Sequence, residues 1–291
     1  MRINLNPKIE YVIAMLVFGS VGLPVRFLPL PSGWIAMIRG LVGCLFLLAV
    51  RRKPDRKAFQ KNWLPLLVSG IAIGLNWIFL FEAYRHTTIA VATLLYYLAP
   101  VLVMLLSPVI LKEKLTWKQG GVIAVALFGM VLVSGVGAGE GAGGLHGIVM
   151  GILAACFYAT VMLANRFLKE LEALDRTIFQ LGIAGLTVLP YALLREGFSA
   201  AWFDWRSILL LALVAIVYTG IAYALYFDGL ARLPGSASAV LAYLDPVTAL
   251  LLSSLVLGEK MGVPQMIGAV LILGALLYGQ LSDMKKSKKT V

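Results

Sequence analysis

Ten apolar segments, separated by short polar stretches, make up most of this 291-residue chain. A helix of roughly 20 residues crosses the ~30 Å hydrocarbon core of a bilayer. The pattern therefore predicts an all-α integral membrane protein with ten transmembrane helices, whose ends are located to within a few residues. The ten segments are 9–28, 32–50, 63–83, 88–111, 117–136, 146–166, 176–194, 207–228, 236–257 and 263–281.

The charge content excludes a soluble domain of ordinary type. Only 13% of the residues are charged and 60% are hydrophobic, whereas a soluble domain has about 25% charged residues. A net charge of +11 on a soluble protein would suggest a nucleic-acid partner. Here the basic residues lie in the short loops between apolar segments, so we expect membrane lipid as the environment and no nucleic-acid partner.

The distribution of lysine and arginine predicts the orientation of the chain. With the N-terminus inside, 19 of the 25 basic residues fall in inner segments and 4 in outer segments. Cytoplasmic loops carry such an excess. We therefore expect both termini in the cytoplasm and a multi-pass location in a bacterial-type cytoplasmic (inner) membrane.

The chain contains an internal duplication with a period of 146 residues, which is the signature of a repeat architecture. It predicts a first repeat at 1–136, an external linker at 137–146 and a second repeat at 147–291. Each repeat has five helices, an odd number, so the second is inverted in the membrane, as in many transporters. The matched pairs are Gly74 and Gly220, Tyr97 and Tyr243, Pro100 and Pro246, Glu113 and Glu259, Lys114 and Lys260, and Gln119 and Gln265.

A duplicated set of residues carries a resemblance to a known family. In each half a proline is followed by a basic–acidic cluster, a glutamine and a Gly-rich helix. With the ten-helix count, this set resembles the EamA-type branch of the drug/metabolite transporter superfamily, over essentially the whole chain. The resemblance implies transport of small metabolites across the cytoplasmic membrane, often outward. The residues are Pro100, Glu113, Gln119 and Gly129, and then Pro246, Glu259, Gln265, Gly268 and Gly274.

Two prolines, Pro100 and Pro246, fall in the middle of the fourth and ninth segments. Proline removes a backbone donor and frees the carbonyl four residues earlier, here at Tyr96 and Ala242. Within a bilayer such carbonyls need a partner or a water-lined cavity. The prolines predict helix kinks, which either serve packing alone or border a substrate site.

Aromatic residues at similar depth form the predicted wall of that site. Tyrosines usually gather at the membrane interface, so tyrosines at mid-depth are expected to point inward. An aromatic wall suits an apolar or cationic substrate, although packing between helices is an alternative for each residue. Asn76 is a further candidate for a substrate hydrogen bond or for an interhelical one. The wall residues are Trp77, Tyr96, Tyr97, Tyr158, Tyr218, Tyr223 and Tyr243.

Charged residues within the apolar segments are costly to bury, and they indicate function or structural pairing. Arg39 and Glu82 lie at depths that allow an ion pair, with Arg26 as a rival partner of Glu82. Asp228 occupies the place of Glu82 in the second repeat. Asp245 precedes Pro246, where the first repeat has Ala99. We expect Asp245 to face the pathway, and Glu82, Asp228 and Asp245 to be the groups available for proton coupling.

Other residues indicate structure. Glu113 and Glu259 each precede a helix and are interpreted as caps of its positive end. His86 and His146 fall at segment edges and predict no ligand cluster. Cys44 and Cys156 are interpreted as packing residues, so neither a metal nor a cofactor is expected.

These features predict a secondary transporter of small organic metabolites, such as amino acids or amines, that works by alternating access. Export is one of the two directions that the sequence leaves open. The partner is then a small-molecule substrate. One chain supplies a complete pathway, and a homodimer stays open. An efflux carrier for lipophilic cations is the alternative; a channel or a membrane-embedded enzyme fits less well, because filter and catalytic signatures are absent. Amino acids would use Arg39 and Asp245 for the carboxylate and ammonium groups, whereas cations need only the aromatic wall and an acid.

Overall fold

The computed structural model describes residues 6–51, 55–112, 114–134 and 144–287, and these form helices joined by short turns. A helix satisfies its backbone polar groups internally, which the bilayer interior demands. Among the described residues, nine helical stretches are long and apolar enough to cross a membrane. They correspond to nine of the ten predicted segments. The tenth, 236–257, is divided between two shorter helices.

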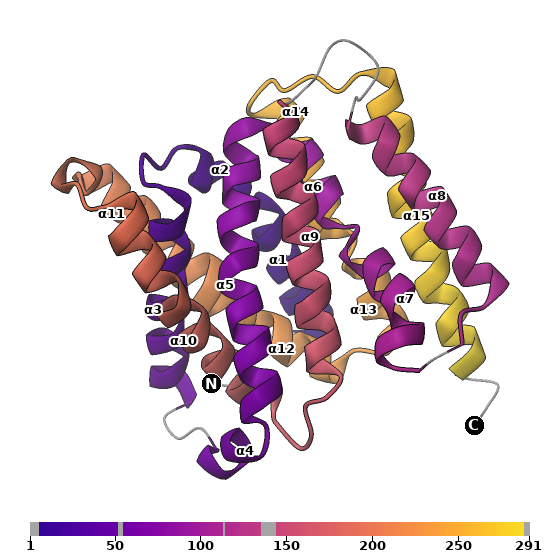
Figure 1. Cartoon of the computed structure of the whole chain (residues 1–291), viewed down its shortest axis with the longest axis horizontal. Coiled ribbons are helices and arrows are strands. Elements are labelled where there is room, and N and C mark those ends of the chain that lie inside the picture. Colours follow the sequence, from indigo (N-terminus) through magenta and orange to yellow (C-terminus); the bar gives the residue numbers. More distant parts are fainter. Residues whose placement is uncertain (1–5, 52–54, 113, 135–143, 288–291) are drawn as a thin grey trace.

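The first repeat contains helices α1 to α8 (Figure 1). Its first span is interrupted at Val21, and its fourth span is interrupted at Tyr97 and Leu98. A short helix, α4, precedes the third span. The bounds are α1 Pro7–Ser20, α2 Gly22–Arg26, α3 Ser32–Arg51, α4 Arg56–Lys61, α5 Trp63–His86, α6 Ile89–Tyr96, α7 Ala99–Ile110 and α8 Trp117–Ser134.

The second repeat contains helices α9 to α15. Its eighth span includes a π-helix, η3, which the sequence pattern did not predict. The bounds are α9 Leu145–Asn165, α10 Ala173–Tyr191, the π-helix η1 Ala192–Glu196, the 3₁₀-helix η2 Ala200–Trp202, α11 Trp205–Ala212, η3 Leu213–Ile221, α12 Ala222–Arg232, α13 Gly235–Leu241, α14 Leu244–Leu255 and α15 Val263–Ser287.

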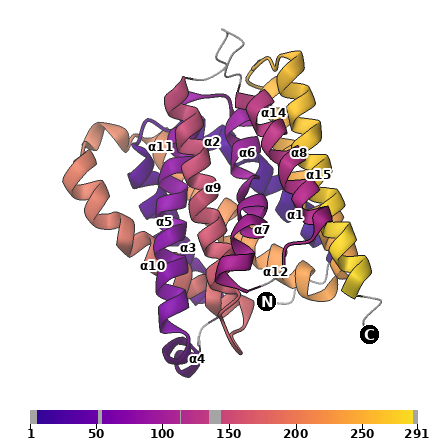
Figure 2. The same cartoon turned by 45° about the vertical axis from the view of Figure 1, so that its right-hand side comes forward.

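Contacts between helices follow a two-fold rule. α3 packs on its counterpart α10, and α8 packs on its counterpart α15. The pair α5–α9 is matched by the pair α12–α1, and α6–α7 against α9 is matched by α14 against α1. Figures 1 and 2 show α8 beside α15 and α5 beside α9. The long helices named here therefore have their main partners in the other repeat, as expected for a duplicated bundle with a central axis.

Both broken helices stop at the same place in their repeats. α6 ends at Tyr96 and α7 begins at Ala99, with Pro100 in its first turn. α13 ends at Leu241 and α14 begins at Leu244. Proline fits the first turn of a helix, where its missing N–H has no partner in any case. The prolines thus start a new helix after each break.

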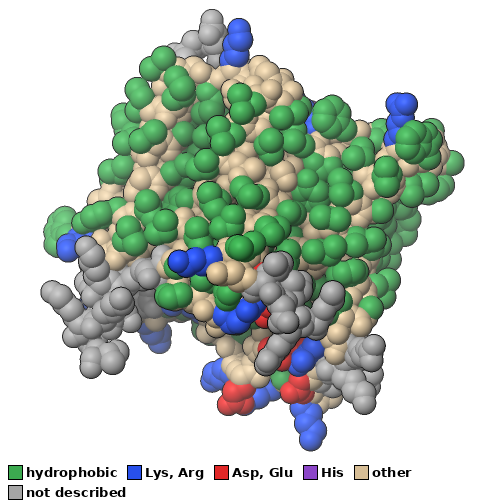
Figure 3. Space-filling view, turned by 180° about the vertical axis from the view of Figure 1, so that it is seen from behind, with side chains coloured by type: hydrophobic (Ala, Val, Ile, Leu, Met, Phe, Trp, Pro, Cys, Tyr) green, Lys and Arg blue, Asp and Glu red, His purple; other side chains and the backbone are tan. Residues whose placement is uncertain are grey.

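The two ends of the bundle differ in charge. We call the end where α1 begins and α15 ends the terminal face, and the other end the opposite face; the N and C marks lie toward the terminal face in Figure 1. Hydrophobic side chains cover the middle of the surface in Figure 3, and most of the charged ones gather at the terminal face. The cytoplasmic location of the terminal face stays a prediction from the distribution of lysine and arginine.

Candidate functional site

A cavity of about 340 Å³ lies between the two repeats, next to both broken helices. Its wall extends from the breaks toward the terminal face, where α9 ends and α10 begins. Described residues from α1, α5, α6, α7, α9, α10, α12, α14 and α15 contribute to it. They include Tyr11, Phe18, Asn76, Trp77, Tyr96, Tyr97, Pro100, Tyr158, Asn165, Arg176, Gln180, Tyr223, Tyr226, Phe227, Ala242, Asp245 and Gln280.

Asp245 is the acid in this wall. It is the second residue of α14, immediately after the break. Its carboxylate interacts electrostatically with the hydroxyl group of Tyr97, which follows α6 at the equivalent break of the first repeat. Asp245 forms no salt bridge with any basic residue in the described part of the chain. A carboxylate in this position can bind a positively charged ligand.

Aromatic rings surround the carboxylate. Tyr96 stacks on Tyr158, with ring centroids 4.7 Å apart and an interplanar angle of 12°. Tyr97 meets Tyr96 edge-on at 6.1 Å. On the other side of the cavity, Tyr223 packs against Phe18 at 5.1 Å. Four of the predicted wall tyrosines, two from each repeat, therefore line the cavity: Tyr96, Tyr97, Tyr158 and Tyr223.

Two predicted wall residues lie elsewhere. The hydroxyl group of Tyr218 accepts a hydrogen bond from Ser20 at 3.1 Å, and the residue packs against a buried apolar cluster to which α3, α5 and α10 contribute. Tyr218 belongs to η3, whose wider turn changes the direction of its side chains relative to an α-helix. Tyr243 packs against a second buried cluster, formed by α6, α7, α8, α9 and α15, and its buried hydroxyl makes no hydrogen bond with a described residue.

Several wall residues were absent from the sequence prediction. Tyr11, Phe18, Tyr226 and Phe227 belong to α1 and α12, which pack together around the cavity. Tyr11 and Tyr226 lie toward helix ends. A tyrosine near a helix end is expected at the membrane interface, so the sequence does not distinguish an interfacial tyrosine from one that lines the cavity. Only the tertiary contacts separate these two positions.

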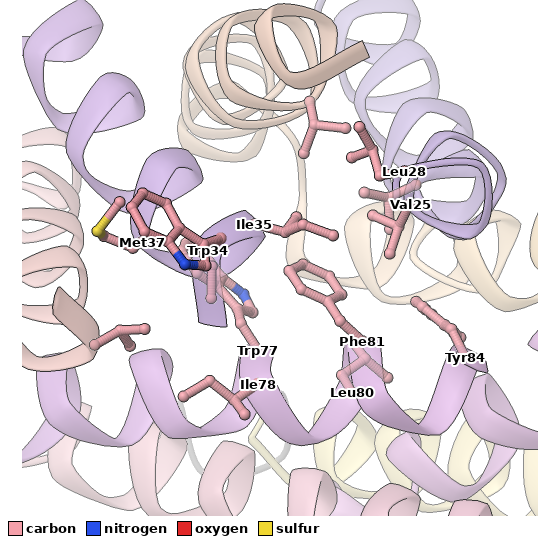
Figure 4. Packing of buried hydrophobic residues seen from close by; sticks show 14 of the residues in the cluster. Val25, Leu28, Trp34, Ile35, Met37, Trp77, Ile78, Leu80, Phe81 and Tyr84 are labelled. Atoms are coloured by element: carbon pink, nitrogen blue, oxygen red, sulfur yellow. The ribbon is translucent and has the colours of Figure 1, made fainter. Parts of the chain in front are cut away.

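Arg39 lies behind the wall. It is 5% exposed, and its guanidinium stands 4.3 Å from the ring centroid of Trp77, which lines the cavity. Its Nε donates a hydrogen bond to Thr219 at 2.7 Å. Figure 4 shows Trp77 and Phe81 on one face of α5, and Arg39 is 5.7 Å from the Phe81 ring.

The predicted Arg39–Glu82 pair is therefore wrong. The side chain of Glu82 contacts Ser32 and His86, at 2.8 and 2.9 Å, near the end of α5. Arg39 lies on the level of Trp77, more than one helical turn deeper. The predicted depths of Arg39 and Glu82 in the membrane were compatible with an ion pair. In the structure the guanidinium of Arg39 instead makes cation–π contacts with the rings of Trp77 and Phe81.

Glu82 and Asp228 do not line the cavity. Each forms an i,i+4 pair at a helix end, Glu82 with His86 and Asp228 with Arg232. Arg232 also pairs with Glu10, whose side chain is fully buried. These contacts tie α12 to α1 at the terminal face. Of the three acids expected to serve proton coupling, only Asp245 reaches the cavity.

Polar residues complete the wall. Asn76 donates a hydrogen bond to the Ala154 carbonyl at 2.6 Å and so joins α5 to α9. Gln180 donates to Ser69 and to Asn165, both at 2.7 Å. Arg176 is the basic residue in the wall, near the terminal face and 6.0 Å from the Phe227 ring.

Comparison with known proteins decides the family. A family model described as the EamA-like transporter family matches residues 10–135 and, a second time, residues 145–278. The chain belongs to the EamA-like transporter family. The two matches correspond to the two halves of the duplication, and the family makes this a multi-pass membrane protein and a metabolite transporter.

Relatives of this EamA-like protein are also transporters. It is 30% identical to the "Uncharacterized transporter YxxF" of Bacillus subtilis, covering 97% of this chain and 92% of that one. It is 28% identical to the "Threonine/homoserine exporter RhtA" of Escherichia coli K12, covering 97% and 94%. A solved structure, titled only "Crystal structure of protein", shares the fold with a TM-score of 0.63 and 21% identity, covering 93% and 95%.

The opposite face of this EamA-like transporter is held by polar contacts. Arg26 donates to the carbonyl groups of Tyr84 and Thr87, and its other nitrogen lies 3.4 Å from Glu259 as an ion pair. Glu259 accepts from Ser253 and, at 2.9 Å, from the backbone N–H of Ile89. These contacts join α2, α5, α6 and the α14–α15 loop.

Glu259 was predicted to cap the helix that follows it. The structure places it at the N-terminus of α6, which begins at Ile89 and belongs to the other repeat. The physical reason for the cap is unchanged, because a carboxylate stabilises the positive end of any helix it reaches. Its counterpart Glu113 lies outside the described residues.

Gly19 allows α1 to approach the break before α14. A Cβ at this position would overlap the carbonyl oxygen of Asp245 and lie 2.8 Å from Thr248. We expect Gly19→Ala to destabilise the protein by about 1–3 kcal/mol, because overpacking displaces the backbone, and to reduce transport. Thermal unfolding in detergent measures the first effect. Gly274→Ala is the matched control, since nothing lies within 4 Å of that position; an equal loss in both variants would contradict the prediction.

Proposed function

We propose that this protein is a secondary transporter that moves small amine-bearing metabolites, with amino acids first among them, by alternating access. The observation that carries the proposal is Asp245, the acid in an aromatic cavity at the break of two helices. An ammonium group gains both ionic attraction from the carboxylate and cation–π contact with the surrounding rings. The RhtA relative, named as a threonine and homoserine exporter, supports amino acids.

The carboxylate of an amino acid has two candidate partners. Arg176 lines the cavity toward the terminal face. Arg39 lies behind Trp77 and would be reached by a change of the indole position. Because both ionic groups of an amino acid are costly to desolvate, a site for it needs both signs of charge. Asp245 with one of these arginines supplies both.

The arrangement of contacts supports an inward-open state. The cavity extends to the terminal face, whereas the opposite face is joined by the contacts of Arg26 and Glu259. The excess of basic residues at the terminal face supports its cytoplasmic location. From this state a substrate would bind from the cytoplasm and be released after the opposite face opens; the step is reversible, and the gradients across the membrane set whether the net flow is export.

An efflux carrier for lipophilic cations is the second candidate. The aromatic wall favours it, because Tyr96, Tyr158 and Tyr223 offer ring faces to a cation without any need for a carboxylate partner. Arg176 distinguishes the two candidates. Replacing it with glutamine should weaken binding of an amino acid and leave binding of a lipophilic cation unchanged or stronger.

Counterflow in proteoliposomes tests the proposal. Liposomes preloaded with one unlabelled compound, from a panel of amino acids, amines and lipophilic cations, are exposed to the same compound with a radioactive label. We expect transient accumulation of label for at least one amino acid, because a carrier exchanges substrate across the membrane. Protein-free liposomes and the Asp245→Asn variant are the controls. Ohmic current without counterflow would indicate a channel and contradict the proposal.

A further inference from the structure

The two histidines of the chain meet at the opposite face, although they are 60 positions apart in the sequence. His86 is the last residue of α5, and His146 is the second residue of α9. Glu82, one turn before His86, completes the group. The sequence prediction kept the histidines apart, because nothing in their local patterns shows that α5 and α9 are the most extensively packed pair of the bundle.

The ligand atoms of these three side chains converge. One atom of each lies within 4.8 Å of the others. The Nε2 of His86 is 2.9 Å from Oε1 of Glu82, and the two imidazole rings meet edge-on with centroids 4.6 Å apart. The second carboxylate oxygen of Glu82 accepts a hydrogen bond from Ser32 at 2.8 Å, which orients it. His86 and His146 are exposed, so an ion can reach them.

At the terminal face, the position equivalent to this group by the repeat symmetry is occupied by a positively charged side chain. Glu82 and His86 correspond, at the 146-residue period, to Asp228 and Arg232. There the guanidinium of Arg232 is bound between Asp228 and Glu10 and ties α12 to α1. At the opposite face the equivalent helix pair is α5 and α9, and the basic side chain is replaced by two imidazoles. Imidazoles and a carboxylate are metal ligands, whereas a guanidinium is not.

We propose that Glu82, His86 and His146 form a binding site for a divalent transition-metal ion, with Zn²⁺ as the best fit. Two histidines and one carboxylate are a known zinc ligand set, which leaves a fourth position for water. Ser32 acts as the outer partner of the carboxylate ligand. Since α5 lies in the first repeat and α9 in the second, the ion joins the two repeats at the opposite face.

Metal binding to the purified full-length protein tests this inference. The protein carries a tag without histidine and is treated with chelator before titration with Co²⁺. We expect one equivalent of Co²⁺ to give the visible absorption of a tetrahedral centre, and Zn²⁺ to displace it and to raise the thermal unfolding temperature. His86→Ala and His146→Ala should each lower the affinity more than about tenfold, and Ser32→Ala about tenfold.

Leu145→Ala is the matched control, because Leu145 is exposed, adjoins His146 and contributes no ligand atom. Size-exclusion chromatography shows whether each variant is folded, and His146→Gln replaces His146→Ala if that variant aggregates. Binding by the wild-type protein and by Leu145→Ala, but not by the histidine variants, supports the site. The inference is overturned if the wild-type protein binds no stoichiometric metal, or if the histidine variants bind it equally well.

Discussion

Replacing Asp245 with asparagine is expected to reduce substrate affinity, and with it transport at low substrate concentration, by at least about 30-fold. The change keeps the shape of the side chain and its contact with Tyr97, but it removes the acid from the cavity wall. Losing one partner of a desolvated charge pair costs about 2–5 kcal/mol, and about 1.4 kcal/mol is a factor of ten. Binding measured by thermal shift and uptake by counterflow give the two readouts.

Asp228→Asn is the matched control for this prediction. It makes the same chemical change in the same repeat, but Asp228 lies at the end of α12 beside Arg232 and outside the cavity wall. We expect its transport to stay within a few-fold of the wild-type value. If transport is coupled to protons, the pH dependence should flatten in Asp245→Asn and persist in Asp228→Asn. Normal transport by Asp245→Asn would remove the observation on which the proposed function rests.

Glu259→Gln is expected to open the opposite face. The side chain of Glu259 is 10% exposed and joins the N-terminus of α6 to Arg26 and Ser253. Glutamine keeps the size but loses the ionic attraction in a partly buried place, so the state with this face closed should lose roughly 1–2 kcal/mol. That corresponds to a shift of about 10-fold in the ratio of the two states.

Cysteine labelling from the outside measures this shift. A cysteine introduced at Phe27, which is 63% exposed at the opposite face, gives the fully accessible reference, and one introduced at Trp77, in the cavity wall, gives the readout. The probe at Trp77 should react about tenfold faster in Glu259→Gln. Lys260→Gln, an exposed neighbour, should leave the rate unchanged. An unchanged rate in Glu259→Gln would show that these contacts do not hold the face closed.

The sequence was sufficient to predict the helices and their duplication, because both depend only on the order of residues along the chain. Segment length and apolar content predict a span whatever its neighbours. Depth predicted an inward direction for Tyr96, Tyr97 and Tyr158, since a hydroxyl group in mid-membrane needs a polar surrounding. The same argument was wrong for Tyr218 and Tyr243, which do not line the cavity. Asp245 was predicted to face the pathway because it replaces Ala99 of the first repeat, and it lines the cavity.

Side-by-side relations could not be predicted in this way. Arg39 and Glu82 are close in depth, but only packing shows that Trp77 takes the guanidinium. His86 and His146 lie at the ends of two segments that are distant in the sequence, and only the packing of α5 on α9 brings them together. The π-helix η3, which moves Tyr218 out of the cavity wall, depends on hydrogen bonds that residue types alone do not specify.

The first break carries Ala99 where the second carries Asp245. When the two repeats exchange conformations, the resulting state is therefore not equivalent to the starting one. The inward-open and outward-open states differ in free energy and in substrate affinity. Detailed balance forbids this difference from driving net flux, because tighter binding at one face is offset by a smaller population of the state that presents it. The asymmetry can set the fraction of binding sites that substrate occupies from each side of the membrane at a given concentration. The direction of net flow is set by the gradients across the membrane.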